Sequence, residues 1–100
     1  MTMAPSSAAA AAAPVATNEV AIKDFAFAPG TVTVKAGTTV TWTNNDQDPH
    51  TVTSTGTGGP LKSATMQNGE KYTYTFTTAG TFEYLCTIHP FMTGTVVVTA

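Results

Sequence analysis

One seven-residue segment near the end of the chain carries three side chains that bind soft metal ions. It reads Cys86-Thr-Ile-His89-Pro-Phe-Met92, so a thiol, an imidazole and a thioether follow one another at three-residue intervals. A second histidine, His50, stands upstream directly after Pro49, and the chain has one cysteine and two histidines in all. Two imidazoles, one thiolate and a weak, distant methionine sulfur are the donors of a blue-copper electron-transfer site. These residue types predict one metal centre.

The spacing within this segment argues against a helix. On a helix, Cys86 and Met92 would lie about 9 Å apart along the axis, at roughly 1.5 Å per residue, which is too far for one ion. Pro90 also biases His89 away from helical dihedral angles. We therefore expect a tight loop that brings the three side chains to one point, with His50 arriving from a different strand.

The single cysteine has a plainer interpretation as well. Cys86 cannot form a disulfide within the chain, and a lone cysteine is often a buried, inert thiol or half of an intermolecular pair. The neighbouring His89 and Met92, together with His50, favour a metal site over both. Zinc also takes cysteine and histidine ligands, and we interpret a zinc-filled site as mis-metallation during heterologous expression.

Size and charge exclude several classes of partner. One hundred residues allow one small domain, and 4 basic against 6 acidic residues give a net charge of −2, with only 10% of residues charged. Such a chain lacks the basic face that nucleic acid requires, and it has no stretch long and apolar enough to span a bilayer. We expect no nucleic-acid partner and no membrane-spanning segment, and nothing in the sequence suggests anything but a monomer.

From residue 19 onward, short runs alternate apolar and polar residues with period two, the pattern of half-buried strands. We predict strands at residues 20–22, 31–34, 40–43, 51–53, 72–76, 82–86 and 95–98. About seven strands without a convincing helix indicate an all-β sandwich or barrel. The core candidates are Ile22, Val34, Trp42, Phe76, Phe82 and Val96.

The first 18 residues have a different composition, with six alanines at residues 8–13 closed by Pro14. A run this short is a marginal helix in water, and it lacks the basic start and strongly apolar core of a signal peptide. We predict a disordered Ala/Pro/Ser-rich linker at residues 1–18 and the folded domain at residues 19–100. The linker is either the stub left by export or lipid anchoring, or a cloning remnant.

Cys-x2-His-x2-Met with a Pro-His pair upstream resembles the cupredoxins, the blue copper proteins, and most of all their amicyanin-like and plastocyanin-like members. The resemblance runs from about Glu19 to Ala100 and takes in residues 40–44, 49–51 and 80–92. It implies a Greek-key β-sandwich and one type 1 copper ion per chain. The implied metal ligands are His50, Cys86, His89 and Met92.

The resemblance also implies roles for residues beside the ligands. Asn44 matches a family asparagine that ties the His50 loop to the residue after the cysteine, here Thr87. The backbone amide of Thr51 matches a family hydrogen bond to the cysteine sulfur, and such bonds orient ligands and tune the metal. Asn44 and Thr87 also have a plainer interpretation as ordinary turn and loop residues.

In the family, the histidine of the ligand loop has one ring edge at the surface, so the resemblance makes His89 the exit for electrons. An exposed apolar collar around it would mark a docking surface. We expect redox-protein electron donors and acceptors to dock there in small, weak encounters. The collar residues are Pro49, Leu61, Met66, Pro90 and Phe91, although core packing is an alternative for Met66 and Phe91.

Together, the residues and the resemblance predict a small soluble type 1 copper protein that shuttles single electrons by cycling between Cu(I) and Cu(II). Copper storage or delivery with the same ligands is the alternative. We expect no enzyme, because copper oxidases and nitrite reductases need further histidines, and the carboxylates Asp24, Asp46 and Asp48 have no histidine or nucleophile left over as a catalytic partner. The resemblance implies an exported protein, periplasmic or otherwise outside the cytoplasm, with the linker as an optional tether.

Overall fold

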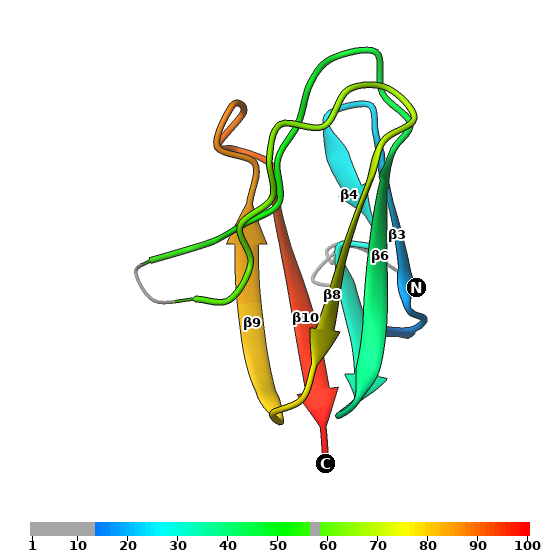
Figure 1. Cartoon of the computed structure of the whole chain (residues 1–100), viewed down its shortest axis with the longest axis vertical. Helices are drawn as coiled ribbons and strands as arrows, with labels where there is room; N and C mark the ends of the chain where they lie inside the picture. The colour runs from blue at the N-terminus through cyan, green and yellow to red at the C-terminus, as the bar shows by residue number, and fades with distance from the viewer. Residues whose placement is uncertain (1–13, 57–58) are drawn as a thin grey trace, which may run out of the picture.

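The structure is a computed structural model that describes residues 14–56 and 59–100. In that part of the chain, strands form two sheets that pack face to face (Figure 1), and the predicted all-β sandwich is confirmed. One sheet contains, in spatial order, β2 (Val15–Ala16), β5 (Thr31–Lys35), β10 (Thr93–Thr99), β9 (Gly80–Leu85) and β7 (Thr53–Ser54). The other contains β4 (Ala26–Ala28), β3 (Glu19–Lys23), β6 (Thr38–Asn44) and β8 (Lys71–Phe76). None of the described residues forms a helix that could cross a membrane.

Both sheets are mixed. β10 pairs with β5 in parallel and with β9 in antiparallel orientation, and β6 pairs with β3 in parallel and with β8 in antiparallel orientation. The alternating sequence pattern is visible in the burial. In β6, Val40, Trp42 and Asn44 are buried, whereas the residues between them are partly exposed. Five of the seven predicted strands lie within observed ones, because one face of each is covered by the opposite sheet. The strand predicted at residues 51–53 is wrong except at Thr53, the first residue of β7, and the one predicted at residues 82–86 ends at Leu85.

The predicted start of the domain at Glu19 is too late. Val15 and Ala16 pair in parallel with Val32 and Thr33 of β5, so the first sheet already includes them. A two-residue strand is too short to show an alternating pattern, so no period in the sequence indicates it. Residues 1–13 of the predicted linker lie outside the described residues.

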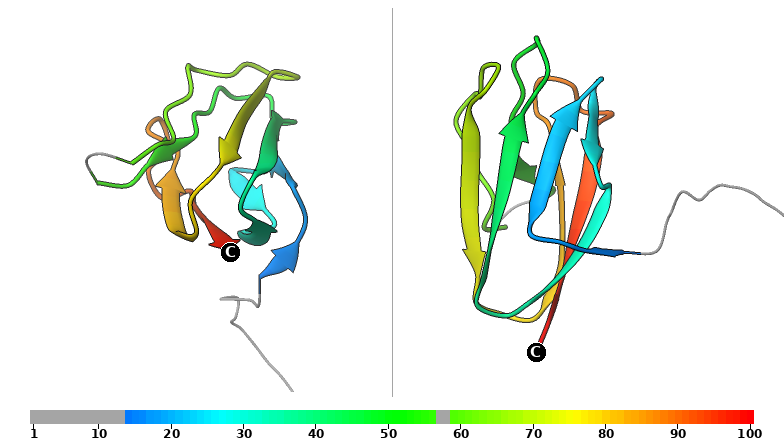
Figure 2. Two further views of the ribbon diagram at one scale, coloured as in Figure 1. Left: turned by 60° about the horizontal axis from the view of Figure 1, so that its bottom comes forward. Right: turned by 90° about the vertical axis from the view of Figure 1, so that its right-hand side faces the viewer.

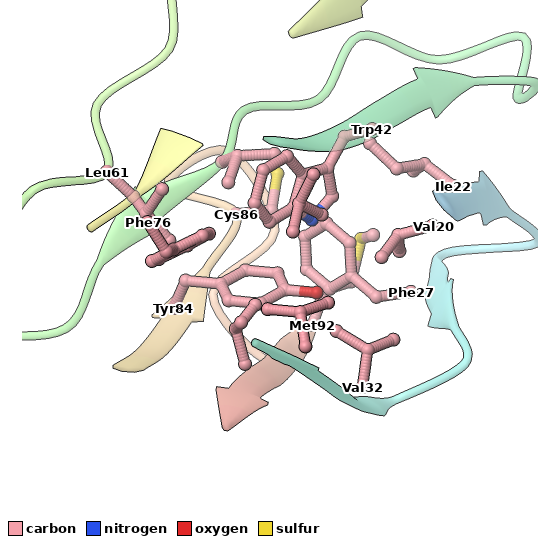
Figure 3. Close-up of a cluster of buried hydrophobic side chains, with 14 of the residues drawn as sticks. Val20, Ile22, Phe27, Val32, Trp42, Leu61, Phe76, Tyr84, Cys86 and Met92 are labelled. Atoms are coloured by element: carbon pink, nitrogen blue, oxygen red, sulfur yellow. The ribbon is translucent and has the colours of Figure 1, made fainter. Parts of the chain in front are cut away.

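The core lies between the two sheets and is rich in aromatic rings. Trp42 and Tyr84 are fully buried and meet edge to face, with ring centroids 5.5 Å apart, and Phe27 meets Tyr84 in the same way at 4.7 Å. Cys86 and Met92 belong to this cluster of buried side chains (Figure 3). Five of the six predicted core residues are buried; Phe82 is only half-buried and packs against the edge of the cluster.

The connections that carry the candidate ligands gather at one end of the sandwich. The β6–β7 and β9–β10 connections, which carry the candidate ligands, lie at the end opposite the C-terminus, together with the turn between β3 and β4 and the later part of the β7–β8 connection (Figures 1 and 2). The two sheets thus bring together four segments that are far apart in the sequence, and the packed core below them provides a rigid base.

Candidate metal centre

Three donor atoms converge at this end of the molecule. The Cys86 sulfur lies 3.6 Å from Nδ1 of His50 and 3.9 Å from Nδ1 of His89, and the two Nδ1 atoms are 3.3 Å apart. A small ion with bonds of about 2.0–2.1 Å to nitrogen and 2.3 Å to sulfur, as zinc has, separates its donors by roughly 3.3–3.6 Å in tetrahedral geometry. The three atoms therefore fit around a single ion, as the grouping of these residues also indicates.

The ligand loop has the predicted shape. Residues 86–92 form bends and a turn rather than a helix. The loop closes on itself, because the amide of Cys86 donates to the Met92 carbonyl at 3.1 Å and the amide of Met92 donates to the His89 carbonyl at 2.9 Å. The Met92 side chain is buried and lies in the same cluster as Cys86 (Figure 3).

His50 is held by its backbone and is completely buried. It forms a two-way bridge with Met66, in which each amide donates to the other residue's carbonyl at 3.1 and 2.8 Å. The Asn44 side-chain amide supports this bridge by donating to the carbonyls of Met66 at 2.8 Å and Asp48 at 3.0 Å. These bonds anchor both sides of the His50 loop to the end of β6.

Thr51, and not Asn44, links the His50 loop to Thr87. The Thr87 amide donates to Oγ1 of Thr51 at 2.9 Å, and the two hydroxyl oxygens are also 2.9 Å apart. The role expected for Asn44 is thus wrong in its partner, since its side-chain amide donates to the carbonyls of Asp48, in the His50 loop, and of Met66, the bridge partner of His50. The Thr51 amide does point at the Cys86 sulfur, at a nitrogen–sulfur distance of 3.4 Å.

These contacts act on the acidity of Cys86. Burial by itself raises the pKa of the thiol, but hydrogen bonds from the Thr51 amide and from the His50 and His89 groups outweigh it and lower the pKa from 9.0 to about 6. The thiolate is the form that binds a metal. The protein surroundings therefore favour the metal-binding form of Cys86 before any ion enters.

Two residues that the sequence analysis did not assign to the site, Asp46 and Phe25, lie against its histidines. Asp46 Oδ2 lies 2.9 Å from His50 Nε2, and this contact is the first cause of a lowered Asp46 pKa. Phe25 places its ring edge-on to both histidines, with centroids 5.8 Å from His50 and 5.0 Å from His89. The four-residue spacing of Asp46 and His50 was the one available signal, whereas nothing in the sequence marked Phe25.

The predicted apolar collar is only partly at the surface. Leu61 and Met66 are 1% and 4% exposed, so their inclusion was wrong; both side chains fill the core below the loops. Pro90 is exposed, Pro49 is half-buried, and Phe91 is 71% exposed beside the half-buried His89. Near the ligands, two further exposed apolar side chains were missed: Ile88, within the ligand loop, and Phe25, which contacts both histidine rings.

Comparisons with known proteins agree on one family. The family of copper-binding proteins of the plastocyanin/azurin type matches residues 14–99. Amicyanin-alpha of Methylorubrum extorquens is 38% identical over 89 residues, which cover 86% of this chain and 75% of that protein. The crystal structure of amicyanin from Paracoccus versutus superposes with a TM-score of 0.74 at 38% identity, covering 90% of this chain and 88% of that one. A copper-containing nitrite reductase from Thermus scotoductus superposes at 0.77 and 28% identity, where 92% of this chain matches 26% of that chain.

Proposed function

Because this chain belongs to the plastocyanin/azurin family of copper-binding proteins, we propose that it carries single electrons on one type 1 copper ion. His50, Cys86 and His89 supply the three strong ligands, and Met92 supplies a weak axial thioether. The observation that carries the proposal is the convergence of two imidazole nitrogens and one sulfur within 3.9 Å of one another. The mixture of soft and borderline donors suits both Cu(I) and Cu(II).

Bound copper supplies the one-electron chemistry, and the chain holds the ligands still. The bridge between His50 and Met66 and the contacts of Thr51 with Cys86 and Thr87 tie the ligand-bearing connections together. If the ligands move little between oxidation states, little reorganisation is needed when the electron moves. This is what an electron carrier requires of its scaffold.

Electrons enter and leave next to His89 in this proposal. His89 is half-buried, and the exposed Pro90 and Phe91 flank it with apolar surface. Redox-protein donors and acceptors dock on this patch, since exposed apolar patches of this kind mark contact sites. The protein acts as a monomer in these encounters. We infer an exported location, outside the cytoplasm, from the location of the family's members. Fractionation of the host cell tests this location.

The proposal includes no catalytic activity. The nitrite reductase whose structure superposes on this chain is named as a copper-containing enzyme. This chain has two histidines in total, and both belong to the one donor cluster. No histidine is left to build a second copper centre.

The direct test is addition of one equivalent of Cu(II) to the purified protein and to Cys86→Ser. We expect an intense visible absorption band and a type 1 paramagnetic-resonance spectrum from the wild type only, because both depend on the copper–thiolate bond. A colourless wild-type protein at full copper occupancy would contradict the proposal. Electron self-exchange that is fast relative to copper loss then separates a carrier from a copper-delivery protein.

A further inference from the structure

Asp46 occupies an unusual place beside the proposed copper site, on which this inference rests. Its carboxylate oxygen Oδ2 lies 2.9 Å from His50 Nε2 and accepts a second hydrogen bond from the Phe25 amide at 3.1 Å. The other oxygen, Oδ1, accepts from the Gln47 amide at 3.1 Å. The side chain is only 11% exposed, so one nearly buried carboxylate joins a candidate ligand to a second segment of the chain.

The backbone of Asp46 is itself fixed. Its amide donates to Oδ1 of Asn44 at 2.8 Å, and its carbonyl accepts from Nδ2 of Asn68 at 2.9 Å. The carboxylate therefore has a defined position relative to the end of β6. A group that is held in this way can impose an orientation on its partners rather than follow them.

The contact with His50 decides which ring nitrogen is free. An ionised carboxylate only accepts hydrogen bonds, so His50 must carry its proton on Nε2. Nδ1 then keeps its lone pair, and Nδ1 is the atom that faces Cys86 and His89. Metal-binding histidines commonly have their other nitrogen held in this manner, and loss of the partner weakens the site.

The contact with Phe25 positions an aromatic cover. Asp24 and Phe25 adopt φ angles of 52° and 59°, in the left-handed region that non-glycine residues rarely occupy. The hydrogen bond from the Phe25 amide to Asp46 is one interaction that holds this turn against the site. In this turn the Phe25 ring lies edge-on to both histidines.

We propose that Asp46 is a positioning residue of the copper centre, whose carboxylate presents His50 Nδ1 to the metal and holds the Phe25 ring over the two histidine ligands. It also places a negative charge next to the site. A nearby negative charge stabilises Cu(II) relative to Cu(I), so Asp46 lowers the reduction potential.

Two substitutions separate the effect of the hydrogen bond to His50 from the effect of the negative charge. Asp46→Asn keeps an oxygen that accepts from His50 but removes the charge, and Asp46→Ala removes both. The matched control is Asp48→Asn, the same charge change at an exposed position two residues further along the chain. Nitrogen-15 spectra of the copper-free proteins report the His50 tautomer, and amide hydrogen exchange reports the Phe25 contact, so both readings are independent of copper loading.

We expect a His50 with its proton on Nε2 in the wild type and in Asp46→Asn, and a mixture of tautomers with faster Phe25 amide exchange in Asp46→Ala. Cu(II) affinity should fall by about ten- to a hundredfold in Asp46→Ala, as for other partners of metal-binding histidines. The reduction potential should rise in Asp46→Asn by more than in Asp48→Asn.

A wild-type His50 with its proton on Nδ1 would overturn the inference, and this measurement needs no variant to fold. A blue Asp46→Ala protein with unchanged tautomer, affinity and potential would overturn it equally. A wild-type protein that forms no blue site with Cu(II) would instead refute the proposed function, so the two failures are distinguishable.

Discussion

The backbone amide of Thr51 points at the sulfur of Cys86, with 3.4 Å between the nitrogen and the sulfur. The side chain of the same residue accepts the Thr87 amide, directly after the cysteine. One threonine therefore holds Cys86 by its sulfur and by the following peptide. This arrangement stabilises a negative sulfur, since a hydrogen bond to the charged form favours that form.

Cys86 of the copper-free protein should ionise far below the usual range of a thiol, since its pKa is lowered to about 6 from 9.0. The measurement is the ultraviolet absorbance of the thiolate against pH, taken as the difference between wild type and Cys86→Ser. A midpoint close to the ordinary value of 9.0 would contradict the contacts that the structure assigns to this sulfur.

The same shift links stability to pH. A thiol whose pKa is lower in the folded than in the unfolded state stabilises the folded state. This contribution is complete when the pH is above the unfolded-state pKa, and it is lost as the pH falls through the folded-state pKa. The free energy of unfolding of the copper-free wild type should therefore rise between pH 6 and 9 relative to Cys86→Ser. Denaturant titrations across this range under reducing conditions check the slope.

Met92→Gln should lower the reduction potential while copper stays bound, because the axial ligand tunes a blue-copper centre more than it retains the metal. Voltammetry and the visible spectrum are the measurements. Met66→Leu is the matched control, a buried methionine whose side chain has no proposed copper contact, and it should leave the spectrum unchanged. If Met92→Gln changes neither potential nor spectrum, Met92 is not the axial ligand.

Gly94→Ala should destabilise the protein by about 1–3 kcal/mol, the usual cost of overpacking. Gly94 lies opposite Tyr84 across the β9–β10 pair, and an added Cβ would stand 2.4 Å from the Tyr84 phenol. The nearest atom to a Cβ at Gly30 is 3.9 Å away, so Gly30→Ala is the control. Urea denaturation of copper-free protein compares the two, and equal stability of both variants would show that the Tyr84 ring moves aside freely.

Phe91→Ala should slow electron self-exchange and leave folding stability within about 0.5 kcal/mol, as expected for an exposed side chain. Phe91 is 71% exposed next to His89, whereas Val15 is 47% exposed on the strand β2. Val15→Ala is therefore a control for loss of exposed apolar surface elsewhere. Self-exchange rates measured by line broadening should be lower in Phe91→Ala than in Val15→Ala. Equal self-exchange rates in the two variants would show that Phe91 is not part of the docking patch.

The metal-donor residues and the fold class could be predicted from the sequence, because both depend on local patterns of residues. The spacing of Cys86, His89 and Met92 and the presence of Pro90 argue against a helix from the sequence alone. Alternation in β5 and β6 predicted which faces are buried. The two short strands β2 and β4 were missed, since two or three residues show no period.

The expected docking collar failed in part for a related reason. Leu61 and Met66 are apolar residues in a loop-rich region, and the sequence does not show whether such side chains point outward or down into the core. The structure places both below the loops, with 1% and 4% exposure. The backbone of Met66 is held beside His50 by two hydrogen bonds, and its side chain is buried in the core.

By itself, the sequence determined which atoms can bind a metal, since donor chemistry is a property of residue type. It also determined that strands would carry them, because apolar alternation with period two is a local pattern. Only the tertiary structure decided that Asp46 meets His50 Nε2 and that Phe25 meets both histidine rings. Phe25 reaches the centre from a segment that is remote along the chain, and such contacts follow from how two sheets pack, which no single run of residues specifies.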